Sequence, residues 1–463
     1  MIEQELAREA LDEALRGGGS YADVFVQRRN TTCIRYEDGT VDDVSTGLDM
    51  GAGIRAIKGG LAVYVHTDIL DRRHLIRAAG TASDALRHAT EDITLSLPGT
   101  GRTSPVEVCP AGGSPGDIAW IALRLACCDE TARSMSSEVR QVTAMHISQQ
   151  DEILLFTSQG EVLENTCFRT RLVVQVIAAR NGLSQTALEA PGFLQDPPAF
   201  YRDHDPAMTA RIAAERALVM LDARPAPAGK MPVIMHSGTG GVLLHEASGH
   251  GLEADAVQKG ASVFSERLGT RVASELVTAV DDSSVYGLWG SYPFDDEGTV
   301  SGETVLIEKG ILKNFLYARH EAMKAGRPGT GNGRRQSFRH PPIPRMSNTF
   351  IREGDQSPPD IIAATARGLF ARKIGGGQVD PATGDYVFAV SEGYLVEDGV
   401  LGPAVRGAML IGNGPKTLES IDAVGNDLSF DQGTCGKEGQ GVPVTTGCPT
   451  FRIAELTVGG TEV

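Results

Sequence analysis

The chain has 463 residues, of which 41% are hydrophobic and 22% charged; this composition is typical of a globular protein and excludes a mainly disordered chain. Lysine and arginine total 43 against 59 aspartates and glutamates, and the resulting net charge of -16 argues against a nucleic-acid partner. The seven cysteines contain no CxxC pair, which argues against a disulfide framework and against a four-cysteine zinc site.

The first region is predicted to be an N-terminal α/β domain spanning residues 1–94. Apolar residues at helical spacing over 2–16 stop at three glycines, which indicates an amphipathic helix. Strands are expected at 21–28 and 32–36 with further β structure to residue 65, and a second helix is expected at 70–86.

The chain begins with acidic residues and lacks the apolar core of a signal peptide. No run approaches the roughly 18 apolar residues that a membrane-spanning helix needs. We therefore expect a cytoplasmic protein without a membrane partner.

Residues 95–117 are rich in proline, glycine, serine and threonine, which predicts a linker or a long crossing loop. A central α/β region should follow over 118–224. Its predicted helices and strands lie at 118–135, 139–147, 152–158, 171–180 and 205–223.

Residues 230–463 alternate short apolar runs with glycine turns, which predicts a β-rich C-terminal domain, either a barrel or stacked sheets, with one or two embedded helices. The predicted fold class is therefore α+β: an N-terminal α/β region followed by a barrel-like domain that carries a helix with an HExxxH motif.

The HExxxH motif consists of His245, Glu246 and His250, and it follows a glycine-rich turn. Zinc peptidases commonly use HExxH, whose two histidines lie on one face of a helix. One further residue places the two imidazoles about 140° apart on a regular helix. A shared metal therefore requires a bulged turn or a helix that ends between them, and Ser248 and Gly249 are small enough for either.

If both histidines bind a metal, Glu246 is placed to take a proton from water and pass it to the leaving amine. Zinc suits two imidazole donors, but a third ligand is needed. The spacing does not choose among the candidates Cys435, Cys448, His320, His340, Glu253 and Asp255.

Several segments, in this order, resemble the TldD/PmbA family of metallopeptidases, and specifically its metal-binding TldD type. They are HEASGHGLEAD (245–255), FDDEGT (294–299), GNGRRQSFRHPPIPRMSNTF (331–350), GGGQVDPATGDYVFAVSEGYLV (375–396), GNDLSFDQGTCGKEGQGVPV (425–444) and LTVGG (456–460). The resemblance is strong over residues 230–463 and covers the earlier half in layout and length.

The resemblance implies a zinc site formed by His245, His250 and Cys435, with Glu246 as the general base. It also implies a partner subunit of the PmbA (TldE) type in a heterodimer, or a homodimer. The implied activity is hydrolysis of small or unfolded peptides, including peptide or natural-product maturation.

Two further motifs are candidates for substrate binding. Arg334 and Arg335 are placed to clamp a peptide carboxylate, or alternatively to pair internally with the acidic residues 295–297. Gly376 and Gly377 would let a peptide backbone approach and add as a strand, or alternatively form a tight turn with positive φ.

The main hypothesis is a zinc-dependent peptidase subunit, a hydrolase that acts on the amide bonds of small or unfolded peptides. The alternative is a non-catalytic assembly or regulatory subunit with a structural metal, and an intact Glu246 argues against it. A third hypothesis is a regulatory binder of a DNA-associated enzyme, for which the negative charge gives no support.

Overall fold

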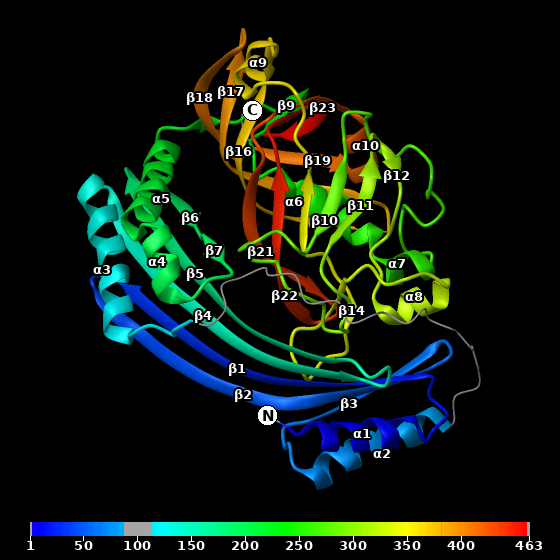
Figure 1. Ribbon diagram of the computed structural model, residues 1–463. Coiled ribbons are helices and arrows are strands. Elements are labelled where there is room, and N and C mark those ends of the chain that lie inside the picture. Colours follow the sequence, from blue (N-terminus) through cyan, green and yellow to red (C-terminus); the bar gives the residue numbers. More distant parts are fainter. Residues whose placement is uncertain (1, 88–112, 381, 461–463) are drawn as a thin grey trace.

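The computed structural model describes residues 2–87, 113–380 and 382–460. Its first half is built on one long antiparallel sheet with the strand order β3-β2-β1-β4-β5-β6, and β7 pairs with β5. The strands of this sheet are β1 (Tyr21–Glu37), β2 (Thr40–Lys58), β3 (Leu61–Thr67), β4 (Val139–Thr157), β5 (Val162–Arg180), β6 (Leu183–Glu189) and β7 (Gly192–Phe193). The sheet curves around the second half of the molecule (Figure 1).

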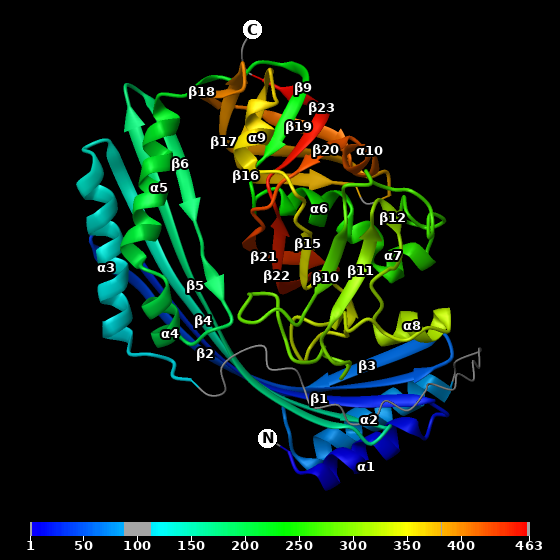
Figure 2. The same cartoon turned by 45° about the horizontal axis from the view of Figure 1, so that its top comes forward.

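The two faces of this sheet have different neighbours because successive side chains point to opposite sides. On β1, Val24 and Ile34 face the helices, whereas Phe25 faces the second half and packs near Phe338. The helices lie on the outer side of the sheet (Figures 1 and 2). They are α1 (Gln4–Leu15), α2 (Arg72–Arg87), α3 (Ile118–Met135), α4 (Pro197–Asp203) and α5 (Pro206–Leu221).

The second half contains a closed barrel of five strands, in the order β16-β9-β23-β19-β17, which closes because β16 also pairs with β17. β18 and β8 extend this sheet from β17, and β20 pairs with β23. These strands are β8 (Arg224–Pro225), β9 (Gly229–Met235), β16 (Arg367–Val379), β17 (Asp385–Glu397), β18 (Val400–Arg406), β19 (Met409–Asn413), β20 (Ile421–Val424) and β23 (Phe451–Gly459).

A six-stranded sheet lies beside the barrel, in the order β12-β11-β10-β15-β22-β21, with a separate short pair β13-β14. These strands are β10 (Ala279–Asp282), β11 (Glu303–Glu308), β12 (Ile311–Leu312), β13 (Gly333–Arg334), β14 (Ile343–Pro344), β15 (Asn348–Ile351), β21 (Ser429–Lys437) and β22 (Gln440–Cys448). The short helices of this half are α6 (Gly241–Ala247), η1 (Gly249–Leu252), α7 (Ala254–Gln258), α8 (Arg319–Ala325), α9 (Pro358–Ala363) and α10 (Gly414–Glu419).

The predicted α+β class and the barrel are confirmed, but several predicted details differ. The strands predicted at 21–28 and 32–36 form one strand, β1, because its polar middle is paired on both sides and needs no turn. The same holds for 139–147 and 152–158, which lie together in β4. The C-terminal half contains more helices than the one or two expected, since segments of five to seven residues carry too few turns to show a period.

The regions predicted as an N-terminal and a central unit contribute strands to the same sheet, because β1 pairs with β4. The predicted linker at 95–117 falls mostly outside the described residues. Of that segment the structure describes 113–117, and Asp117 caps α3 by accepting a hydrogen bond from the Trp120 amide.

The sheet is joined to the second half by a buried charge cluster. Arg55 of β2 donates to Asp23 of β1 at 2.8 Å and also forms an ion pair with Glu297 of the second half. All three side chains are buried. A buried cluster of one guanidinium and two carboxylates is costly to break, since removing one partner leaves an uncompensated charge.

Replacing Arg55 by alanine is expected to lower the free energy of unfolding by about 3–5 kcal/mol, because Asp23 and Glu297 would remain buried without their cation. Urea unfolding followed by circular dichroism measures this change. The control is Arg28→Ala, which removes a partly exposed ion pair with Glu152 and should cost about 1 kcal/mol or less. Equal losses in the two variants would contradict a coupling role for the buried cluster.

Candidate metal centre

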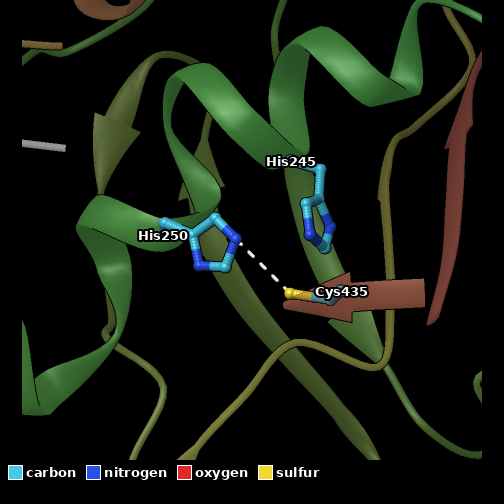
Figure 3. Close-up of side chains that lie close together, drawn as sticks. All are labelled: His245, His250 and Cys435. Carbon is cyan, nitrogen blue, oxygen red and sulfur yellow. Dashed lines mark hydrogen bonds between the residues drawn. The ribbon is translucent and has the colours of Figure 1, made fainter. Parts of the chain in front are cut away.

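His245, His250 and Cys435 converge on one point in the second half of the molecule (Figure 3). One potential ligand atom from each lies within 4.8 Å of the other two. The Nε2 atom of His250 is 3.3 Å from the Cys435 sulfur, and the two imidazole rings have centroids 5.1 Å apart at an angle of 84°. All three side chains are buried or nearly so.

The two histidines reach this point because the helix ends between them. α6 stops at Ala247, Ser248 leaves the helical region with φ −138° and ψ −41°, and the 3-10 turn η1 begins at Gly249. A Cβ at Gly249 would lie 2.2 Å from the Met346 sulfur, so a larger residue there would require Met346 to move. The HExxxH motif therefore begins in α6 and ends in η1, whereas the predicted fold placed it on one helix. Of the two geometries allowed by the sequence, the chain adopts the helix end and not the bulge.

Cys435 comes from the β21–β22 hairpin, where it lies opposite Val442. The fully buried Arg345 supports this hairpin by donating to the backbone carbonyls of Cys435 at 2.5 Å and Gln440 at 3.2 Å. The hairpin thus has a fixed anchor at the residue that carries the sulfur.

A carboxylate and an ammonium group hold His250 in place. Glu253 lies 3.0 Å from the Nδ1 atom of His250, which leaves Nε2 directed toward Cys435. Lys437 donates to Glu253 at 2.9 Å, to Asp255 at 2.7 Å and to the carbonyl of Pro344 at 3.1 Å. Carboxylates that orient a ligating histidine in this way fix its tautomer and raise its basicity.

The charges of these groups are strongly coupled. Burial by itself would raise the pKa of the Cys435 thiol, but His245 and His250 outweigh it and lower the pKa to about 4. Burial opposes the charged form of His250, yet Glu253 and Cys435 raise its pKa to about 10. His250 and Lys437 lower the pKa of Glu253 to about 2 despite its burial. These opposite pKa shifts favour the thiolate form of Cys435 and the imidazolium form of His250.

Glu246 lies beside the cluster and faces an open cavity. Its carboxylate is 3.9 Å from the Nε2 atom of His250, and 35% of its side chain is exposed. With His245 it lines a cavity of about 490 Å³ between the long sheet and the second half, which also includes Arg171, Lys373 and Asp431. The Lys373 ammonium group in this lining is paired with Asp431 at 2.8 Å.

The other candidate third ligands lie elsewhere or have other partners. Cys448 is buried with its sulfur 3.7 Å from the carbonyl of His236, and burial raises its pKa. His320 bonds to the carbonyl of Gly60, and His340 bonds to Ser337. Glu253 and Asp255 contact Lys437, as described above, and none of these five residues belongs to the three-residue cluster.

The two predicted substrate arginines do not line the cavity at Glu246, and both are buried in a second cavity. Arg335 lies 3.7 Å from Asp23 and donates to Tyr64 and to the carbonyl of Asp296. Arg335 is thus paired internally, as the alternative interpretation expected: its ion pair is with Asp23, and it contacts the acidic segment 295–297 through hydrogen bonds to Asp296. Arg334 donates to the carbonyl of Met346 at 2.6 Å.

Gly376 and Gly377 lie in strand β16 and not in a tight turn, where they pair with Ala389 and Phe388 of β17. Gly376 has φ +151° at an irregularity of the ladder. A side chain at Gly377 would meet Phe388 at 2.1 Å, so glycine is needed there for packing. β16 pairs with β9 only over Leu369–Ala371, so within the described residues its second edge is unpaired at the two glycines.

Two residues of the centre were missed by the sequence analysis. Lys437 stands two positions after Cys435, on the same face of a strand, and this period of two was an available signal. Arg345 is 90 residues away from the hairpin that it supports, and no local pattern indicates such a contact.

Three family models match the chain in order. They describe PmbA/TldA metallopeptidase domain 1 at residues 22–86, the central domain at 118–221 and the C-terminal domain at 228–460. A "Metalloprotease TldD homolog" of Haemophilus influenzae is 36% identical over 452 residues, covering 96% of this chain and 93% of the relative. This chain belongs to the PmbA/TldD metallopeptidase family.

Other relatives agree with this family membership. A "Metalloprotease TldD homolog" of Buchnera aphidicola is 33% identical and covers 98% of the chain and 95% of the relative. A "Zinc metalloprotease TldD homolog" of Saccharolobus solfataricus is 35% identical over 234 residues, which are 50% of this chain and 52% of that one. The protein is thus a metallopeptidase, and its relatives are named for a metal-dependent activity.

Solved structures share the fold of this family member. A protein of Thermotoga maritima described as a modulator of DNA gyrase has a TM-score of 0.81 at 22% identity, covering 98% of this chain and all of that one. TldE of Thermococcus kodakarensis has a TM-score of 0.78 at 17% identity and covers 99% of both chains. Within the described ranges, none of the helices is both long and apolar enough to cross a membrane.

The lowered pKa of Cys435 predicts a thiolate in the metal-stripped protein. Because a depressed pKa favours the ionised form, the thiolate should persist at neutral pH and take up a proton only as the pH falls through about 4. The ultraviolet absorbance of thiolate, followed through an acid titration, measures this step, which should be absent in Cys435→Ser. A Cys435-dependent step near the ordinary cysteine value of about 8.5 would contradict the described electrostatics.

Replacing Glu253 by glutamine should weaken metal binding about 10- to 100-fold, because His250 loses the carboxylate that fixes its Nδ1 atom. Competition with a chromogenic chelator measures the affinity. The control is Glu438→Gln, a change of the same charge at an exposed position of the same hairpin, which should leave the affinity unchanged. Equal affinities for wild type and Glu253→Gln would refute the orienting role.

Proposed function

We propose that the protein is a zinc-dependent peptidase subunit in which His245, His250 and Cys435 hold the metal and Glu246 is the general base. The observation that carries this proposal is the meeting of three buried donors with a half-exposed carboxylate at one cavity. Catalytic zinc sites use three protein ligands drawn from imidazoles, thiolates and carboxylates, and they keep a fourth position open.

The residues present fit such an ion. The Nδ1 atom of His245 is buried and has no hydrogen-bond partner, an expensive arrangement for a structure without a ligand at that ring. The lowered pKa of Cys435 favours the thiolate, the form that ligates a metal. His250 has Nδ1 held by Glu253, and its Nε2 atom is therefore directed at the shared point. The Saccharolobus relative, named a zinc protease, supports zinc as the metal.

When bound, zinc supplies Lewis acidity, which polarises the scissile carbonyl and makes water a stronger acid. Glu246 faces the cavity with 35% of its side chain exposed and its carboxylate 3.9 Å from the Nε2 atom of His250, so it is placed to accept a proton from the attacking water. The same carboxylate then delivers that proton to the departing amine. Burial of His245 and Cys435 restricts bulk water on the other side of the centre.

The cavity in front of Glu246 is lined by segments of both halves, and a folded domain does not fit into about 490 Å³. Small or unfolded peptides are therefore the proposed substrates, including peptides in maturation or natural-product pathways. The unpaired edge of β16 at Gly376 and Gly377 provides backbone groups to which an extended peptide can add. The likeness to TldE of Thermococcus supports assembly with a TldE-like partner, or with a second copy, as part of the proposal.

A structural metal in a non-catalytic subunit is the competing function. Structural zinc sites are usually closed by four protein ligands, whereas the cluster in the described residues has three. A structural site also has no need of a carboxylate such as Glu246 that faces an open cavity. The geometry favours catalysis for these two reasons.

Purified wild type should contain about one zinc per chain, and Cys435→Ser and His250→Ala should lose it, because two remaining donors bind zinc weakly. Mass spectrometry of the metal in desalted protein measures the zinc content.

Glu246→Gln should keep its zinc, and its peptide hydrolysis should fall about 10²- to 10⁴-fold, the usual contribution of a general base. Undiminished hydrolysis in Glu246→Gln would exclude the proposed base, and zinc retained in Cys435→Ser would exclude the proposed ligand.

A further inference from the structure

A second cavity, of about 280 Å³, lies between the inner face of the long sheet and the second half of the molecule. It is separate from the cavity at Glu246, but two residues, Arg171 and Thr434, line both. Thr434 directly precedes the proposed metal ligand Cys435 in β21. The two cavities are therefore neighbours that share a wall beside the metal centre.

The second cavity has an excess of positive charge. Its lining contains three carboxylates and five guanidinium groups, from Asp151, Asp295, Asp296, Arg29, Arg169, Arg171, Arg334 and Arg335. The carboxylates already have partners within the protein. Asp151 binds Arg29 at 2.7 Å, Asp295 accepts three backbone N–H groups, and Asp296 accepts the backbone N–H of Arg335.

Arg334 is buried in this cavity, and among the described residues it forms no ion pair with a carboxylate. It donates to the carbonyl of Met346, and its guanidinium carbon lies 5.0 Å from the centre of the Tyr292 ring. Burial lowers the pKa of this guanidinium, and the longer-range attraction of Tyr292 and Asp296 does not offset that effect. A buried cation of this kind is costly unless a ligand neutralises it.

Arg171 occupies the shared wall and is also without a carboxylate partner in the described part of the chain. It donates to the carbonyls of Ala190 and Gln432, each at 3.3 Å, and lies 5.9 Å from the centre of the Trp289 ring. Arg335, in contrast, is occupied by Asp23, Tyr64 and the carbonyl of Asp296. Arg29 and Arg169 face Asp151 at 2.7 and 3.9 Å, so Arg171 and Arg334 are the two cations of this lining that form no ion pair within the described residues.

We propose that this cavity binds the C-terminal carboxylate of the peptide substrate through Arg171 and Arg334. This inference rests on the proposed peptidase function and defines its substrate class as peptides with a free carboxyl end. A guanidinium group forms two parallel hydrogen bonds with a carboxylate, and buried charge-assisted bonds of this kind select strongly for it. Because Arg171 lines both cavities, a peptide anchored there has one of its last bonds beside Glu246, and cleavage releases short C-terminal fragments.

The test uses zinc-loaded full-length protein and two unstructured peptides of one uncharged sequence, one ending in a free acid and one in an amide. Hydrolysis of the acid should have a kcat/KM about tenfold or more above that of the amide, mostly through KM, since the amide lacks the charge that Arg171 and Arg334 compensate. Mass spectrometry of the products locates the cut, which should stay at a constant distance from the C-terminus when residues are added at the N-terminus.

Arg171→Gln should remove most of the preference for the acid over the amide, whereas Arg171→Lys should keep part of it. Arg171 is half-buried whereas Arg334 is buried, so Arg171→Gln is expected to disturb the fold less than Arg334→Gln. Circular dichroism checks that both variants fold. Arg28→Gln is the matched control, because Arg28 lies on the same sheet, is partly exposed and lines neither cavity.

Equal hydrolysis of the acid and the amide by wild type, or an undiminished preference in Arg171→Gln, would overturn the carboxylate site and leave the peptidase proposal intact. An amide whose last residue is glutamate, cut as well as the free acid, would overturn the assignment to the terminal carboxyl group. Calorimetric binding of a short N-acetylated peptide acid and its amide separates the two proposals further. Tighter binding of the acid, lost in Arg171→Gln, without any hydrolysis would overturn the peptidase proposal and support the site.

Discussion

Two histidines five residues apart cannot direct their rings to one ion from a regular α-helix, because each residue turns the chain by about 100°. The interruption at Ser248 and Gly249 removes this obstacle, and the rest of the centre depends on it. Glycine at position 249 lets Met346 pack closely against the turn. Once His250 is redirected, Glu253 and Lys437 fix its orientation, and the sulfur of Cys435 completes the set.

The long sheet contributes to this centre from a distance. It carries no proposed metal ligand, but its inner face closes both cavities, and its buried charges join the two halves through Arg55 and Glu297. Buried ion pairs are weak sources of stability compared with apolar packing, but a mismatched pair is strongly penalised. A cluster of this kind therefore specifies how the halves meet, and with it the position of Arg171 between the two cavities.

Periodicity predicted the outer helices well, because α1, α3 and α5 bury one face against the sheet and differ little from their predicted ranges. It failed for β1 and β4, whose polar middle segments look like turns but are paired along their whole length. The motif predicted His245, Glu246 and His250 as a group, while only the family resemblance selected Cys435. Contacts made across about 90 residues or more, such as those of Arg345 and Arg171, have no local signature.

The central claim is a three-donor centre that serves Glu246, and its donor atoms are observed most directly by X-ray absorption at the zinc edge of the zinc-loaded protein. The account predicts one sulfur at about 2.3 Å and two imidazole nitrogens at about 2.0 Å, with the remaining position filled by an oxygen. The sulfur should disappear from the spectrum of any zinc forced into Cys435→Ser. A wild-type spectrum without sulfur, or with four protein donors and no oxygen, would contradict it.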